Sequence, residues 1–294
     1  TNTTGLNNTS IGFEASKSNN SGNNNTAVGY KAGTRNANGA TAIGSSALTV
    51  NTGDDNTGIG ASALLRNTTG INNIAIGSAA FSYNTSGNNN VVMGYQALLS
   101  SVSNSSNDNT AIGFKSMFNN TIGSQNSVLG YQTLYNNASG TDNVALGYTA
   151  GQYFGAGTSA LTNSSQSIFV GSNVRAGTNS STNEVVIGYG SIGNGSNTVT
   201  IGNSSTMANY FKGSINLTGN VNGGTWSGTT IGSNFGGAGS ITGLLKANGS
   251  GVVSAAVAGT DYQAPLTAGT SFIAPNAAIT AATKTKITYD AFGL

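Results

Sequence analysis

The chain has no cysteine, no histidine and only two prolines among its 294 residues, and only 6% of its residues are charged. The first two absences remove the thiolate nucleophile, the commonest general base and the ligands of most zinc sites. The net charge of +2 is scattered, so no basic stripe could neutralise phosphates and we expect no nucleic-acid binding. No segment approaches the ~20 apolar residues of a membrane helix, so we expect no membrane insertion. The composition predicts a non-enzymatic protein without a cofactor.

The eight carboxylates offer little chemistry, because only Asp54 and Asp55 are adjacent and neighbours in an extended strand point apart. A glycosidase pair assembled across subunits is the enzymatic alternative. The segment 53–56 could also bind calcium at a turn. It lacks the repeated Gly-Gly-x-Gly-x-Asp pattern of calcium β-rolls, so a solvated turn is the favoured interpretation and no metal site is predicted.

What the sequence has in abundance is glycine, 44 residues in all, and much of it is periodic. A glycine that follows a large apolar residue recurs at intervals of mostly 17 residues over two thirds of the chain. A period this short predicts a solenoid or roll in which each repeat stacks on its neighbour. These repeat glycines are Gly12, Gly29, Gly44, Gly60, Gly77, Gly94, Gly113, Gly130, Gly147, Gly171, Gly188 and Gly202.

The residue one position before each repeat glycine is large and apolar, the residue three before it is mostly β-branched, and a mostly small residue such as Ala27 lies between them. Because side chains alternate along a strand, this pattern predicts a short strand with one apolar face and one tightly packed face. We therefore expect the apolar residue and its glycine to form the structural core of the repeat. Representative members are Val28, Gly29, Ile43, Gly44, Ile59, Gly60, Ile76, Gly77, Ile112 and Gly113.

Asparagine stands four residues before the glycine in eight of the twelve repeats, as at Asn56 and Asn73. Asparagine suits turns and can form a ladder of side-chain amides between stacked coils. Alanine stands three residues after the glycine in the first six repeats, often followed by a bulky residue such as Leu48 or Phe81. This segment is interpreted as a second short strand in each repeat.

Each repeat contains few large apolar side chains, so a single coil would bury little surface against the entropy of ordering Gly, Ser and Asn. Three copies wound about one axis would share a core and cover their strand edges. The sequence thus predicts an all-β β-roll or β-solenoid with coils of about 17 residues, assembled as an intertwined homotrimeric fibre. A monomeric β-solenoid is the alternative.

Composition divides the chain into three parts. Residues 1–205 are expected to form the repetitive shaft, 206–236 a glycine-rich neck, and 237–294 an extended β segment leading to a distal domain outside this sequence. Segment 243–251 is interpreted as strand, turn and strand. The wide interval between Gly147 and Gly171 indicates either a surface loop or a local break in the coil. Trp226, in the neck, could stack on a sugar, but plugging the axis or junction of a trimer is favoured.

Aromatic residues follow the repeat glycine in seven repeats. Exposed rings would suit stacking on saccharides. The favoured interpretation is instead that the rings cover the seams between chains. They are Phe13, Tyr30, Tyr95, Phe114, Tyr131, Tyr148 and Tyr189.

The motif Asn-Thr-Ala-Ile-Gly, as at 109–113, resembles the head repeats of trimeric autotransporter adhesins, which wind into a left-handed β-roll trimer. The longer form at 25–32 looks more like repeats of bacteriophage tail fibres, and so do segments 244–251, 258–265 and 285–290. This second resemblance implies the shaft of a homotrimeric tail fibre on the virion tail. It would contact other tail or baseplate proteins and help to recognise a glycan or protein receptor on the host surface. The alternative is an adhesin of autotransporter type on a bacterial cell surface.

Overall fold

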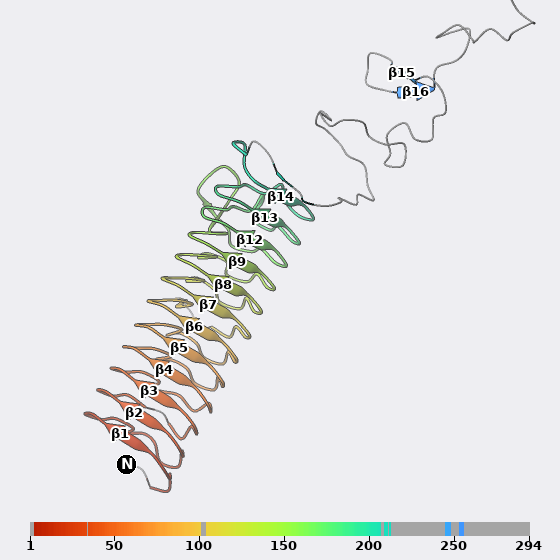
Figure 1. The fold of residues 1–294 in the computed structure, drawn as a ribbon. Coiled ribbons are helices and arrows are strands. Elements are labelled where there is room, and N and C mark those ends of the chain that lie inside the picture. Colours follow the sequence, from red (N-terminus) through yellow and green to blue (C-terminus); the bar gives the residue numbers. More distant parts are fainter. Residues whose placement is uncertain are drawn as a thin grey trace, which may run out of the picture. The chain divides into compact units, whose positions relative to one another are not determined.

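The computed structural model describes residues 3–33, 35–100, 104–206, 209–210 and 212, and the backbone of 245–247 and 253–255. The chain divides into two compact units, Thr1–Ser214 and Ile215–Leu294. The described part of the first unit is all β and has no helix. It forms a parallel β-solenoid of about 11 coils whose repeats lie roughly 17 residues apart, as Figure 1 shows. The predicted all-β solenoid and its repeat length are therefore confirmed.

One strand from each coil joins a single parallel sheet of twelve strands. In every coil the strand consists of the three residues that precede the repeat glycine. The strands are β1 (Thr9–Ile11), β2 (Thr26–Val28), β3 (Thr41–Ile43), β4 (Thr57–Ile59), β5 (Ile74–Ile76), β6 (Val91–Met93), β7 (Thr110–Ile112), β8 (Ser127–Leu129), β9 (Val144–Leu146), β12 (Ile168–Val170), β13 (Val185–Ile187) and β14 (Val199–Ile201).

The register keeps equivalent repeat positions opposite one another. Ile43 pairs with Ile59 and Ala42 pairs with Gly58, for example, and the same pairing holds from β1 to β14. Each column of the sheet therefore contains a single position of the sequence repeat. A contact made by the residue at one repeat position therefore recurs once in every coil along the stack.

The core of the coil is formed by different residues from those predicted. The middle residue of each strand points inward, and Ala42, Ala75 and Val92 are fully buried. The predicted core residue Ile43 is exposed, while Val28, Ile59, Ile76 and Ile112 are only half-buried. The reason is the direction of the pleat, because neighbouring strand residues point to opposite faces and here the middle residue faces the interior. Larger interior side chains come instead from the position four residues after the glycine, namely Leu48, Leu64, Phe81, Leu98, Met117 and Leu134.

The repeat glycines are required by both conformation and space. Gly44 has a φ of +129°, and a Cβ added there would lie 2.6 Å from the carbonyl carbon and oxygen of Gly60 in the next coil. Real Cβ atoms do not approach other atoms so closely, and L-residues rarely adopt this φ. The glycine column is thus where the backbones of successive coils stack most tightly.

The segment after the glycine is not the predicted second strand. It is a turn in which left-handed residues alternate with right-handed ones, as at Ser46 (φ 58°) and Leu48 (φ 53°). The Leu48 N–H donates to the carbonyl of Ala63 in the next coil at 3.0 Å. Left-handed leucine costs about 1–2 kcal/mol, but full burial of its side chain contributes a similar or larger amount. The free energy gained by burying the Leu48 side chain therefore offsets the cost of its left-handed backbone conformation.

The predicted asparagine ladder is confirmed. The Asn73 backbone and side-chain nitrogens both donate to Oδ1 of Asn56, at 3.0 and 3.1 Å. The same pair of bonds continues from coil to coil through fully buried amides. The members of this ladder are Asn56, Asn73, Asn90, Asn109, Asn126 and Asn143.

The insertion between Gly147 and Gly171 forms a hairpin at the surface and does not break the coil. Strands β10 (Tyr153–Phe154) and β11 (Ser159–Ala160) pair antiparallel, while β9 and β12 pair directly with each other. The Arg175 guanidinium donates to the carbonyls of Ala156 and Gly157 at the hairpin tip, at 3.0 and 3.1 Å.

In the second unit β15 (Leu245–Ala247) and β16 (Val253–Ala255) form an antiparallel pair. β15 lies within the segment 243–251 that was predicted as strand, turn and strand, whereas β16 begins just after it. Trp226, nearly all of the predicted neck and the rest of the C-terminal segment lie outside the described residues.

Candidate functional site

The most extensive surface feature is the outer face of the twelve-stranded sheet, defined here as the residues one and three positions before each repeat glycine. From β2 to β13 the middle strand residues between them are buried, but the outer-face residues themselves point away from the coil. Ile43 is 38% exposed and Leu129 is 49% exposed. No residue of the outer face is charged. The outer face is thus a continuous, uncharged and largely apolar surface.

The size of the outer face matters. Strands of three residues at about 3.3 Å each, stacked at roughly 4.8 Å over twelve strands, cover on the order of 500 Å². The largest apolar patch on a typical monomeric protein is about 300–600 Å² and is often functional. The outer face therefore lies at the upper end of what soluble monomers expose.

The aromatic residues predicted as site residues are exposed beside the outer face. They range from Phe114, 37% exposed, to Tyr189, 72% exposed. Four of them come from consecutive coils and stack on one another, with ring centroids 5.5 Å apart for Tyr95–Phe114, 5.0 Å for Phe114–Tyr131 and 4.9 Å for Tyr131–Tyr148. Phe13 and Tyr30 form a separate stacked pair at 5.8 Å. The structure thus brings six of the seven into two stacks.

A second aromatic row lies alongside the first in the same coils and was missed by the sequence reasoning. Phe118 and Tyr135 stack at 5.0 Å, and the Lys115 ammonium lies 5.3 Å from the ring of Phe118 and 5.4 Å from that of Phe114. Burial raises the pKa of the Tyr135 phenol. These residues recur five positions after the glycine in two adjacent repeats. This shared spacing from the repeat glycine is the sequence feature that could have revealed the second row.

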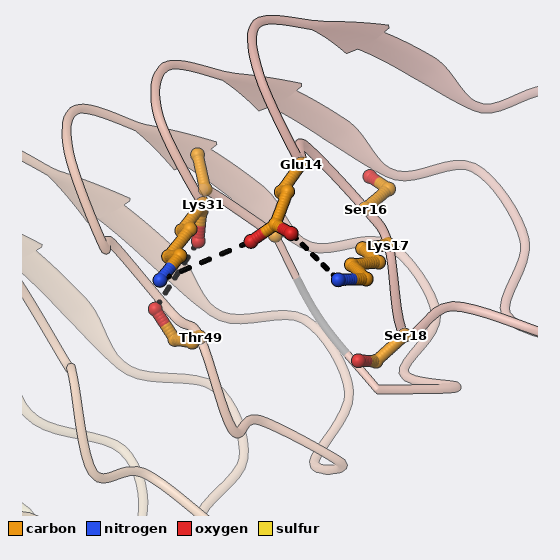
Figure 2. A pocket seen from close by; sticks show the side chains of 8 residues that line it. Glu14, Ser16, Lys17, Ser18, Lys31 and Thr49 are labelled. Atoms are coloured by element: carbon orange, nitrogen blue, oxygen red, sulfur yellow. Dashed lines mark hydrogen bonds and ion pairs between the residues drawn. The ribbon is translucent and has the colours of Figure 1, made fainter. Parts of the chain in front are cut away.

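Near the N-terminus a small open pocket contains the only ion pairs among the described residues. Figure 2 shows Glu14 between two lysines, with Lys17 at 2.6 Å and Lys31 at 3.9 Å. The hydrogen bond from Lys17, together with both ammonium charges, lowers the pKa of Glu14. Thr49 donates to the backbone carbonyl of Lys31 at 3.2 Å. The cluster is solvent-exposed and its one carboxylate is shared by two ammonium groups, so it resembles a surface ion-pair network more than a binding site.

Four other carboxylates among the described residues, those of Asp54, Asp108, Asp142 and Glu184, accept hydrogen bonds. Asp54 Oδ1 accepts from both nitrogens of Asn38 at 2.8 and 3.2 Å, which makes it part of an exterior side-chain ladder. Glu184 occupies the ladder position in its coil and is fully buried. It accepts backbone N–H bonds from Gly177 at 3.1 Å and from Gly195 at 2.7 Å. No group of three potential metal ligands occurs in the part of the chain that the structure describes.

Within the same described residues no helix is long and apolar enough to span a membrane. Comparison with protein-family models, with curated proteins and with solved structures finds no match to this chain.

Proposed function

We propose that this chain forms the shaft of a homotrimeric fibre of the bacteriophage tail type, which helps the particle to attach to its host. The observation that carries the proposal is the outer face, which is uncharged and apolar in coil after coil. A surface of this size is unfavourable in water and favours a partner that covers it.

Another copy of the same chain suits this surface. If copies surround an axis parallel to the stack, each coil meets its equivalent in the neighbouring copies, and one favourable contact is repeated in every coil. Three is the number of copies in the repeats that the chain resembles. In such an arrangement Ile43, Ile76 and Ile112 would line a shared core, although each is at least partly exposed in the single chain.

The proposed role is mechanical. A stack of twelve strands at about 4.8 Å per layer forms a rod on the order of 50 Å long. The ladders and glycine contacts tie each coil to the next, so the rod would resist bending and hold a distal segment away from the particle. Several such fibres on one particle would add avidity to individually weak contacts with the host surface.

A trimeric adhesin on a bacterial surface is the second candidate, favoured by the Asn-Thr-Ala-Ile-Gly motif at 109–113. Both candidates require the same trimer and differ in where the protein is located. Gold-labelled antibodies against this chain should decorate virion tails in electron micrographs if the fibre proposal is right. Labelling of cell envelopes in the absence of phage would favour the adhesin.

The assembly itself is tested by sedimentation equilibrium of the full chain. The expected mass is three times the chain mass of 29.1 kDa, independent of concentration over the micromolar range. A compact folded species with the mass of one chain would contradict both candidates.

A further inference from the structure

The aromatic strip is defined as the two ring rows and the residues between them in the coils of β6 to β9. The first row is Tyr95, Phe114, Tyr131 and Tyr148, the second row is Phe118 and Tyr135, and the column between them contains Gln96, Lys115 and Gln132.

The strip is local, whereas the outer face is not. The apolar residue before the glycine is present in all twelve repeats. At the first-row position, by contrast, the three coils before the strip have Ser45, Ala61 and Ser78, and the coil after it has Ser172. A contact between copies that repeats in every coil would require the same residue type in every coil. Five of the twelve repeats have no ring at this position, and only the coils of β6 to β9 stack four rings in succession, which indicates a role separate from a contact repeated in every coil.

The rings are also accessible in a way that suits a ligand. Phe114 and Tyr131 are inclined by only 5°, yet their centroids lie 5.0 Å apart. Close carbon contact is at about 3.5–4.0 Å, so the two rings are not in full face-to-face contact, and they remain 37% and 40% exposed. The Lys115 ammonium already reaches the faces of Phe114 and Phe118. Partly uncovered aromatic faces are surfaces on which the C–H faces of sugar rings pack.

The polar groups of the strip select the charge of the ligand. Lys115 is the only charged residue of the strip, and the only ion pairs among the described residues are those of Glu14 in the first coils. The ammonium is therefore held by ring faces and not by a carboxylate. Gln96 and Gln132 flank it along the stack and supply amide donors and acceptors. One cation suits a ligand that is bound mainly through its sugar rings and makes a single charge contact, whereas nucleic-acid binding draws much of its affinity from several neutralised phosphates.

From this arrangement we propose that the aromatic strip binds an extended acidic polysaccharide, with sugar rings against the aromatic faces and a uronate carboxylate on Lys115. The chain of the glycan would run parallel to the coil stack, because the rings and donors repeat in that direction. This inference does not depend on the fibre proposal, since sedimentation tests the trimer and glycan titration tests the strip.

The experiment is calorimetric titration of the full chain with a galacturonate decasaccharide, with a cello-oligosaccharide as the neutral probe. We expect the acidic probe to bind in preference to the neutral one. Tyr131→Ser and Lys115→Gln should each weaken that binding by about tenfold or more, because each removes one stacking or charge contact. Lys115→Arg, which retains the charge and the ring contact, should bind close to normally. Phe13→Ser removes an exposed ring of the same column outside the strip and should leave binding unchanged.

Several results would overturn the proposal. These are no binding of the acidic probe, equal binding of the neutral one, or affinity that is unchanged in Tyr131→Ser. Binding of oligo-dT at least as tight as that of the galacturonate would assign the strip to single-stranded nucleic acid. If the unsubstituted chain binds neither sugar and Tyr131→Ser lowers the sedimenting mass, the rings belong to a contact between copies.

Discussion

Asn90 and Asn73 lie in successive coils and are joined twice, since the backbone and side-chain nitrogens of Asn90 both donate to Oδ1 of Asn73, at 3.0 and 2.9 Å. Both residues are fully buried. The side-chain oxygen of each asparagine thus accepts the backbone N–H of the asparagine in the next coil. The side chain of that next asparagine makes the same bonds one coil further on. The interior of this solenoid is polar along one edge, and the ladder amides along that edge are paired.

Asn90→Ala should therefore be strongly destabilising. It removes the acceptor of both Asn109 nitrogens and the side-chain donor to Asn73, and it leaves buried polar groups without partners at a cost of roughly 3 kcal/mol. The midpoint of urea unfolding measures the effect. Ser45→Ala, at an exposed position, is the control and should change the midpoint little. Equal midpoints for the two variants would mean that the ladder contributes little to stability.

Ser116→Ala should stabilise the protein. The Ser116 hydroxyl is buried and has no hydrogen-bond partner, at a position where the first six repeats have alanine. Removing an unpaired buried hydroxyl should add about 1 kcal/mol. Thr133→Ala, at the same position one coil later, should have the opposite sign, because its hydroxyl donates to the Gly147 carbonyl at 2.6 Å. Thermal unfolding of both variants measures the pair, and shifts in the same direction would contradict this account.

Gly44→Ala should disrupt stacking of the coils. Its Cβ would meet the Gly60 backbone, which cannot move aside without displacing the next coil, so we expect a loss of about 3 kcal/mol or more. Gly190→Ala is the comparison, because its φ of +60° lies in the left-handed region that Ser46 and Leu48 also adopt, and its added Cβ would meet only the end of the Asn203 side chain at 3.9 Å. In urea unfolding Gly190→Ala should cost far less, and equal losses for the two variants would contradict the tight stacking at Gly44.

Ile43→Glu should separate folding from assembly. Ile43 is exposed in the coil, so the single chain should still fold and keep its β circular dichroism. A charge on the outer face would have to be desolvated in the proposed trimer, at a cost of several kcal/mol for each copy. The sedimenting mass is therefore expected to fall to that of one chain. Ser21→Glu, at an exposed turn away from the sheet, should retain the full mass, and a trimer that survives Ile43→Glu would place the contact elsewhere.

The ion pairs of Glu14 predict a small pH dependence. Because the folded pKa of Glu14 is lowered, its stabilising contribution is present above the unfolded pKa, near 4.5, and is lost as the pH falls through the lower folded value. Carbon-detected NMR titration should find the Glu14 carboxyl titrating below that value. Lys17→Met should return it toward 4.5, and an unchanged titration in that variant would rule out Lys17 as the main cause.

The amino-acid sequence by itself determined the repeat. Contacts between successive coils require particular residues at fixed positions of the repeat. These are the glycine, the small residue two positions before it and the asparagine of the ladder. The parallel stack, the coil length and the amide ladder could therefore be predicted, because a periodic requirement leaves a periodic pattern in the chain.

Only the tertiary structure decided which side of each strand is inside. The alternation of side chains along a strand does not say which face is buried. The larger residues suggested that their face is inside, but Ile43 points outward and Ala42 inward. The turn after the glycine was missed for a related reason, because Leu48 adopts a left-handed conformation that only the burial of its side chain makes favourable. Likewise only the folded coil brings the Lys115 ammonium over the rings of both Phe114 and Phe118. Burial depends on the path of the whole coil, which no local pattern specifies.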